Sequence, residues 1–389
     1  MKQIPFARPF TTKKEIKYVS KAIRSGWLTT GKVTAQFETE FAKTVGAKYA
    51  LAVNSATAGL HLALLASGIT NQDSVITTPY TFVATAEVIS YIGAEIKFVD
   101  IEKDSPLIDL NKIADAITSK TKAVIPVHYG GESVQIQALM KICKPHNIAC
   151  IEDAAHAFPA KTENGYVGTQ GDIGVYSFYA TKTLTTAEGG MIITKNKQFY
   201  EAMKQLRLHG INKDIWDRYT NTKANWEYDV VTTGFKYNLT DIASSLGLAQ
   251  LSIADKMQER RTAIAKNYLK ELRALHEMGL VDLPRFSPCH SWHLFPIQIP
   301  EQGSFLENRT LRDRWMNQLS QKGIGLSVHY KPLHLMSYFQ KEKGYTPNDF
   351  PNASNRFSRS FSLPIYPGLT KAQCNYIIKA LKEVIKNGC

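Results

Sequence analysis

The stretch YALAVNSATAGLHLALLAS (residues 49–67) indicates the fold class, because it joins two different patterns without a break. The apolar run 49–54 is typical of a β-strand, and the run 59–67 that follows the small residues is typical of an apolar helix. The same pair of patterns recurs downstream. The strand-like runs are 74–78, 95–100, 123–127 and 148–153, and the helix-like runs between them are 82–92, 110–117 and 134–146. Short strands that alternate with amphipathic helices predict βαβ units and a mainly parallel sheet.

The second half of the chain follows a different pattern. After strand-like runs at 173–178 and 191–194, a stretch without proline, 241–275, predicts one long helix. Beyond it, shorter runs predict a small α+β unit; they are 293–299, 311–321, 325–329, 361–365 and 371–386. We therefore expect a large α/β domain over residues 1–252 and a smaller α+β domain over residues 253–389.

The composition is that of a folded protein, with 44% hydrophobic and 21% charged residues in a chain of 389. It excludes a disordered chain, and five cysteines are too few for a disulfide framework. The N-terminus MKQIPFARPF lacks an apolar run and a cleavage site. We therefore expect no signal peptide. The longest weakly polar stretch, 49–69, is interrupted by polar residues, so we also expect no membrane span, and we expect a cytoplasmic location.

The net charge of +13 raises the question of nucleic-acid binding. The basic residues are interspersed and form no RNP, zinc-finger or basic-helix pattern. Over residues 12–24 the apolar Ile16, Val19 and Ile23 recur at helical spacing, which predicts a docked helix whose lysines face water. We interpret the charge as a solvated surface, although a positive field would also suit a phosphate-bearing substrate.

Three features lie at the carboxyl ends of predicted strands, where open parallel sheets bind their ligands. The first is NSATAG (54–59). Its small residues leave backbone N–H groups free to bind an anion at the N-terminus of a helix. An N-cap formed by Asn54 or Ser55 would explain the same residues without any ligand.

The second feature is IEDAAH (151–156), where an apolar strand ends in Asp153 and His156 follows three residues later. A buried carboxylate needs a cationic partner or several hydrogen bonds, and a protonated heterocyclic nitrogen is one such partner. Helix capping by Asp153 beside a packed His156 is an alternative. We predict no metal site, because neither these residues nor the other histidines and cysteines have a spacing that completes a coordination shell.

The third feature is SFYATKTLTTAEGGM (177–191), in which a strand ends at Ser177 and a hydroxyl-rich loop then presents Lys182. A single loop lysine is usually a solvated surface charge. In desolvating surroundings, however, a lysine has a lowered pKa and becomes a Schiff-base nucleophile. Together, the anion cradle, the carboxylate and the lysine would serve pyridoxal phosphate.

The ordered motifs NSATAGLHLAL, TTPYTFVAT, IPVHYGG, IEDAAHAF, GVYSFYATKTLTTAEGGMI and KYNLTDI resemble the sugar-nucleotide aminotransferase family of DegT/DnrJ/EryC1/StrS type. This family has the aspartate aminotransferase fold, fold type I, and makes amino sugars for lipopolysaccharide, capsule and other glycans. The resemblance extends from Arg8 to about Lys386. Residues 25–31, 208–218 and 292–295 are most similar to the UDP-4-amino-4-deoxy-L-arabinose aminotransferases.

The resemblance implies roles for the matching residues. Lys182 would form the Schiff base with pyridoxal phosphate and then move the proton, while Asp153 would hold the ring nitrogen. The remaining cofactor contacts that it implies are His156 beside the ring, Phe82 stacked on it, and Ala56, Thr57, Ser177 and a second subunit's Asn238 on the phosphate. The implied substrate-binding residues are Thr29, Arg218, Lys236 and His329. Two positions depart from the pattern: Phe82 stands where the arabinose enzymes have Trp, and Tyr179 where His is frequent.

The expected reaction is transfer of an amino group from glutamate to C4 of a nucleotide-linked 4-keto sugar, by a homodimer with shared active sites. Lysine at position 182 separates the chain from dehydratase relatives, which have His there, and the following residues resemble the C4-aminating branch. The alternatives are a 3-amino-transferring or dehydrating relative, a non-catalytic cofactor-binding regulator, and a basic nucleic-acid binder. The expected partners are the nucleotide sugar and glutamate, without nucleic acid or membrane.

Overall fold

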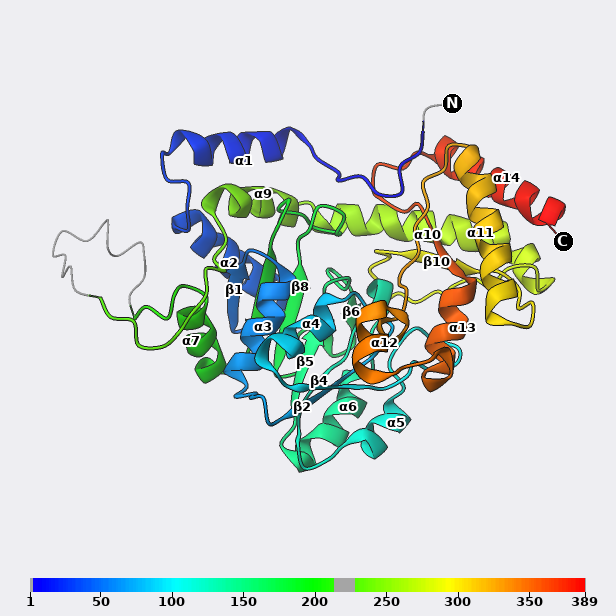
Figure 1. The fold of residues 1–389 in the computed structure, drawn as a ribbon. Helices are drawn as coiled ribbons and strands as arrows, with labels where there is room; N and C mark the ends of the chain where they lie inside the picture. Colours follow the sequence, from blue (N-terminus) through cyan, green and yellow to red (C-terminus); the bar gives the residue numbers. More distant parts are fainter. Residues whose placement is uncertain (1–2, 213–227, 389) are drawn as a thin grey trace.

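A seven-stranded sheet forms the centre of the protein in a computed structural model that describes residues 3–212 and 228–388 (Figure 1). The strands are β1 (Tyr49–Val53), β2 (Ser74–Thr77), β3 (Glu95–Phe98), β4 (Thr121–Ile125), β5 (Ala149–Asp153), β8 (Ile173–Ser177) and β9 (Gly190–Thr194). Their order in the sheet is β1-β9-β8-β5-β4-β2-β3. The pairs from β8 to β3 are parallel, whereas β9 is antiparallel to both β8 and β1. The sheet is therefore mainly parallel, as the sequence predicts.

Helices cover both faces of this sheet, because its strands are apolar on both sides. Leu51 and Val53 of β1 pack in one cluster with α3 (Ala56–Ala66), α4 (Ala84–Ile92) and α7 (Lys197–Leu206). Ala50 and Ala52, which alternate with them, pack in another cluster with Phe37 of α2 (Lys32–Val45). Helices α5 (Leu110–Ala116) and α6 (Ile136–Cys143) pack on alternate residues of β2, β4 and β5.

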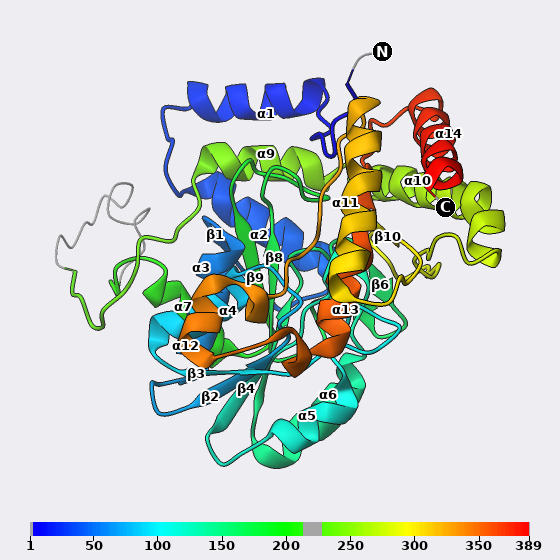
Figure 2. The same ribbon diagram turned by 45° about the vertical axis from the view of Figure 1, so that its right-hand side comes forward.

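The C-terminal part packs around a cluster of its own. Its elements are α10 (Ala254–Glu277), β10 (Phe295–Gln298), α11 (Phe305–Gln321), α12 (Ser337–Lys343), α13 (Pro351–Arg359), β11 (Ser360–Leu363) and α14 (Lys371–Gly388). Strands β10 and β11 are antiparallel, and α14 packs against both α10 and α11 (Figures 1 and 2). The cluster contains buried residues from 264 to 385 together with Ile4, which pairs with Ile324. The division of the chain at residue 252 stays a prediction.

Two predicted elements have a different form in the structure. The helix expected over 241–275 is two helices, α9 (Asp241–Leu251) and α10, separated by a turn at Ser252 and Ile253. Neither proline nor glycine stands at this turn, so no local signal marked it. The run 325–329 is not a strand in the described chain; one isolated bridge, from Ser327 to Ser362, forms there.

Helix α1 (Lys13–Arg24) lies along α9 (Figure 1), but the face it buries is not the predicted one. Ile16 and Ile23 are 68% and 54% exposed, whereas Glu15 and Ala22 are buried. Burial of Glu15 is tolerated because its carboxylate accepts hydrogen bonds from the backbone N–H of Thr12 (2.6 Å) and from Nε2 of Gln250 (2.7 Å). The apolar stripe of α1 therefore faces outward in the single chain.

The remaining named elements are short. They are the hairpin of β6 (Lys161–Thr162) and β7 (Gly165–Tyr166) and the 3₁₀ turns Tyr129–Gly131, Lys144–His146, Leu333–Leu335 and Pro347–Asp349. Across the residues that the structure describes, no helix combines the length and the apolarity that crossing a lipid bilayer requires.

Candidate active site

A cavity of about 480 Å³ opens where β1, β5 and β8 end. Residues that follow these strands line it, together with residues of the C-terminal part. The predicted site residues that line it are Ala56, Thr57, Phe82, Asp153, His156, Ser177, Lys182 and His329. Residues that are far apart in the sequence thus meet at the carboxyl edge of the sheet.

The N-terminus of α3 forms one wall of the cavity. Ser55 is the N-cap, because its Oγ accepts a hydrogen bond from the N–H of Ala58 (3.1 Å). Among the described residues, none accepts a hydrogen bond from the N–H of Ala56 or Thr57, and both residues line the cavity. Gly190 leaves room beside them, since a Cβ at that position would lie 2.8 Å from the nitrogen of Ala56. The N-cap is therefore present, and the same turn leaves two backbone N–H groups without an acceptor beside the cavity, as the predicted anion cradle requires.

Asp153 ends β5 with its side chain almost fully buried. Its Oδ2 accepts a hydrogen bond from Oγ1 of Thr85 (2.8 Å), and its Oδ1 accepts one from the N–H of Ala155 (3.1 Å). Burial raises the pKa of the Asp153 carboxyl. No helix follows it, since residues 155–159 form turns, so the helix-capping alternative is wrong. A buried carboxyl with a raised pKa gains most from a cationic partner such as a protonated ring nitrogen.

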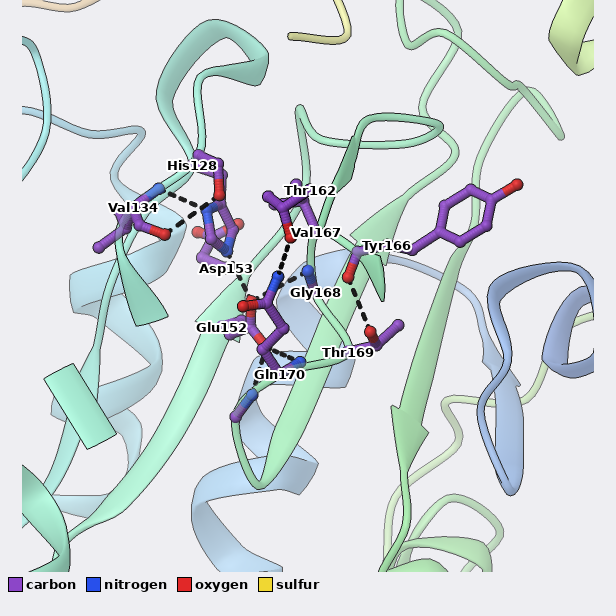
Figure 3. Close-up of polar contacts among 12 residues, drawn as sticks. His128, Val134, Glu152, Asp153, Thr162, Tyr166, Val167, Gly168, Thr169 and Gln170 are labelled. Atoms are coloured by element: carbon purple, nitrogen blue, oxygen red, sulfur yellow. Dashed lines mark hydrogen bonds and ion pairs between the residues drawn. The ribbon is translucent and has the colours of Figure 1, made fainter. Parts of the chain in front are cut away.

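Glu152, the residue before Asp153 in β5, anchors the same strand end through hydrogen bonds of its side chain (Figure 3). Its fully buried carboxylate accepts four hydrogen bonds, from His128 Nε2 (2.8 Å) and from the N–H groups of Gly168 (2.9 Å), Gln170 (2.7 Å) and Gly171 (2.6 Å). The N–H of Val134 donates to His128 Nδ1 (3.1 Å), so the proton of the neutral ring lies on Nε2. This network anchors the end of β5 and with it Asp153. No motif in the sequence indicated this role for Glu152.

Lys182 lies in the loop between β8 and β9, and threonine hydroxyls hold that loop in place. Thr185 Oγ1 donates to the carbonyl of Phe178 (3.1 Å), and Thr183 Oγ1 donates to the carbonyl of Phe158. In the described part of the chain, the Lys182 ammonium has neither a hydrogen bond nor an ion pair. Burial lowers the pKa of Lys182 to about 8, against the opposing effect of Asp153. Lys182 is therefore poised to act as a nucleophile near neutral pH.

Three imidazoles line the cavity beside Lys182: His156, His293 and His329. Burial lowers the pKa of His156 and of His293 well below the usual value, and that of His329 to about 4. All three rings are therefore neutral near pH 7. Nδ1 of His329 lies 3.0 Å from Oγ of Ser362. As a predicted substrate contact, His329 can offer a hydrogen bond but no positive charge.

The other predicted residues do not line this cavity. Asn238 donates through Nδ2 to Oγ1 of Thr30 (2.6 Å), next to Thr29, and Lys236 donates through Nζ to Oδ1 of Asn238 (2.7 Å). Thr29, Lys236 and Asn238 thus lie together outside the cavity. Arg218 lies outside the described residues.

Among the cavity residues that sequence reasoning missed, three carry polar groups that the site can use: Thr85, His293 and Tyr330. Thr85 and His293 belong to motifs that carried the family resemblance, but their own contacts were not assigned. Tyr330 follows the predicted His329 in the chain. No local pattern marks these side chains, because tertiary packing alone brings them to the carboxyl edge of the sheet.

The chemistry of this donor set fits pyridoxal phosphate. The cavity offers unpaired backbone N–H groups at a helix N-terminus for a phosphate, a buried carboxyl for a ring nitrogen, and an unpaired lysine with a lowered pKa. On a mainly parallel sheet flanked by helices, these features define an enzyme of the fold-type I class.

The chain belongs to the DegT/DnrJ/EryC1/StrS aminotransferase family, whose model matches residues 9–382. It is 40% identical to the spore coat polysaccharide biosynthesis protein SpsC of Bacillus subtilis over 98% of this chain and 97% of that protein. Its structure is similar to that of Helicobacter pylori PseC, an aminotransferase involved in the biosynthesis of pseudoaminic acid (TM-score 0.88, 29% identity, 99% and 100% of the two chains). It is also similar to NtdA of B. subtilis with bound cofactor PMP (TM-score 0.87, 25% identity, 99% and 86% of the two chains). The chain is thus a pyridoxal-phosphate-dependent aminotransferase with the fold-type I architecture.

Proposed function

We propose that this enzyme transfers the amino group of glutamate to C4 of a nucleotide-linked 4-keto sugar, in the biosynthesis of a cell-surface polysaccharide or glycan. The observation that carries the proposal is the meeting of Lys182, Asp153 and the α3 N-terminus in one cavity. The similarity to SpsC and PseC, whose names refer to polysaccharide and amino-sugar biosynthesis, supports a sugar as acceptor.

Each residue would contribute a separate function. Pyridoxal phosphate supplies an electron sink and carries the amino group between the two substrates. The N–H groups of Ala56 and Thr57, with Ser177, would bind its phosphate, and Phe82 would stack on the ring. Asp153 would keep the ring nitrogen protonated, and Lys182, freed from the cofactor, would move the proton at the substrate carbon. The low pKa of Lys182 suits this work, because the lysine must accept and release a proton near neutral pH.

We further propose that the enzyme acts as a homodimer, in which Thr29, Lys236 and Asn238 complete the partner's site. These residues lie together but outside the cavity of their own chain. The exposed Ile16 and Ile23 of α1 give the single chain an apolar stripe, which favours an interface. An isologous dimer would bury the same stripe of both copies.

The experiment that tests the reaction is incubation with glutamate and UDP-linked 4-keto sugars, followed by NMR of the product. An amine at C4 would support the proposal; an amine at C3 or a dehydrated sugar would establish the corresponding relative instead. Lys182→Ala should abolish turnover, whereas Lys197→Ala, an exposed lysine of α7, should leave it unchanged. Substantial turnover by Lys182→Ala would contradict the mechanism.

A further inference from the structure

Tyr330 reaches the cavity from the C-terminal part, and contacts with neighbouring rings hold its own ring in place. The ring stacks on His156, with centroids 6.0 Å apart and planes 24° apart. Its centroid also lies 5.9 Å from that of Phe82, with the two rings tilted by 54°. The backbone just before it is also held, because the carbonyl of His329 accepts hydrogen bonds from the hydroxyls of Tyr80 (2.9 Å) and Tyr129. The ring therefore has little freedom to turn.

The contacts of His156 determine whether the hydroxyl of Tyr330 donates or accepts in the hydrogen bond between these two side chains. The N–H of Gly130 donates to Nδ1 of His156 (3.1 Å), so Nδ1 must carry the lone pair. Because burial keeps this ring neutral by lowering its pKa, its proton lies on Nε2. Nε2 is 3.0 Å from the hydroxyl oxygen of Tyr330. His156 is therefore the donor in this hydrogen bond, and the hydroxyl oxygen of Tyr330 accepts.

The loop 290–294 of the C-terminal part keeps this arrangement in place. Ser291 Oγ donates to the carbonyl of His156 (2.5 Å), and its N–H donates to the carbonyl of Gly131 (3.1 Å). The N–H of Leu294 donates to the carbonyl of Gly130 (3.2 Å). Gly130 has a φ of 62°, in the left-handed region that favours glycine, and this conformation points its N–H at His156. The donor to His156 is thus fixed by backbone geometry.

The proton of the Tyr330 hydroxyl has no acceptor among the described residues, since His156 is its hydrogen-bond partner there and acts as donor. Burial raises the pKa of Tyr330, so the hydroxyl keeps this proton at neutral pH. A polar hydrogen without an acceptor in a partly buried site is destabilising unless a ligand accepts it. The residue lines the same cavity as Lys182.

We propose that Tyr330 donates a hydrogen bond to an oxygen of the ligand bound beside Lys182, and that His156 is the positioning residue that directs it. The inference rests on the proposed function for the presence of a keto sugar in the cavity. The acceptor is an oxygen with partial or full negative charge, which either the ring hydroxyl of the cofactor or the carbonyl of the sugar supplies. The two sources are separated by experiment.

The test is Tyr330→Phe, which keeps the ring packing and removes only the hydroxyl. Two quantities are measured: the Kd of the apo protein for pyridoxal phosphate, from fluorescence titration, and kcat/KM for the keto sugar. A charge-assisted hydrogen bond predicts a loss of about 10- to 100-fold in one of them. A weaker cofactor Kd identifies the cofactor oxygen, and a lower kcat/KM with an unchanged Kd identifies the sugar oxygen. Tyr338→Phe, an exposed tyrosine of α12, is the matched control.

The role of His156 is tested by a double-mutant cycle with His156→Phe. If His156 acts through Tyr330, His156→Phe should reduce the affected quantity much less in the Tyr330→Phe background than in the wild type. His156→Gln, whose amide can still donate to the hydroxyl, should restore part of the loss. Additive effects would overturn the positioning role.

Unchanged Kd and kcat/KM in Tyr330→Phe, measured beside an active wild type, would overturn the proposal for the tyrosine. A wild type that binds pyridoxal phosphate but aminates none of the keto sugars would contradict the proposed function instead. In that case the cofactor Kd of Tyr330→Phe still decides whether the hydroxyl contacts the cofactor. The two failures are therefore distinguishable.

Discussion

Replacement of Glu152 by glutamine should destabilise the protein although it changes a single atom. The carboxylate is fully buried, and each of its oxygens accepts two hydrogen bonds: Oε2 from His128 and Gly168, Oε1 from Gln170 and Gly171. In Glu152→Gln, one oxygen becomes an NH₂ group, which faces two donors in either orientation. Two lost hydrogen bonds to a charged acceptor, at about 1.5–3 kcal/mol each, correspond to a loss of about 3–6 kcal/mol in the free energy of unfolding.

The measurement is urea unfolding of the apo protein, followed by tryptophan fluorescence and compared with the wild type under the same conditions. Glu163→Gln provides the matched control, because Glu163 is exposed in the turn between β6 and β7. Its free energy of unfolding should change by less than about 0.5 kcal/mol. If Glu152→Gln unfolded at the wild-type urea concentration, the carboxylate would not be holding the strand end, and the reasoning from its four hydrogen bonds would be refuted.

Three further predictions concern the cofactor site and the interface. Burial lowers the pKa of Lys182 to about 8. The rate of covalent pyridoxal phosphate capture by the apo protein should therefore rise with pH, with a midpoint at about that pKa, and level off above it. A midpoint of about 10.4, the pKa of a free lysine, would contradict this. Gly190→Ala should weaken pyridoxal phosphate binding about 5- to 100-fold in a fluorescence titration, since its Cβ would overlap the nitrogen of Ala56, whereas Gly368→Ala has room and should bind normally. Ile23→Glu should shift the proposed dimer toward monomer in sedimentation velocity, and an unchanged distribution would place the interface elsewhere.

Much of the site could be predicted because its reactive residues lie in short sequence motifs at the ends of predicted strands. Asp153 is the last residue of one apolar strand and Lys182 lies in the loop that follows another, and strands of a parallel sheet end at a common edge. The small residues around Ala56 identified the helix N-terminus in the same way. The family resemblance then assigned their roles, and the structure brings all three segments to one cavity.

What could not be predicted depends on packing between distant segments. The periodicity of α1 showed an amphipathic helix, but not that α9 would cover its Glu15 side and leave Ile16 exposed. The turn at Ser252 has no helix-breaking residue, so the helical pattern ran through it. Tyr330 reaches the cavity because the C-terminal part packs against the strand ends of the sheet. The sequence around Tyr330 contains no spacing from which this contact could be predicted.

The charges of the cavity bear on why the proposed enzyme would need a second subunit. Among the described residues that line the cavity, Lys182 is the only lysine or arginine, and the three imidazoles are neutral near pH 7. The backbone N–H groups at α3 can bind one phosphate, that of the cofactor. A nucleotide sugar would bring a diphosphate, and the described cavity of one chain offers no further positive charge to neutralise it. Lys236 is exposed and outside that cavity, so we expect it to supply this charge to the site of the partner, which makes dimer formation a condition for substrate binding and not only for stability.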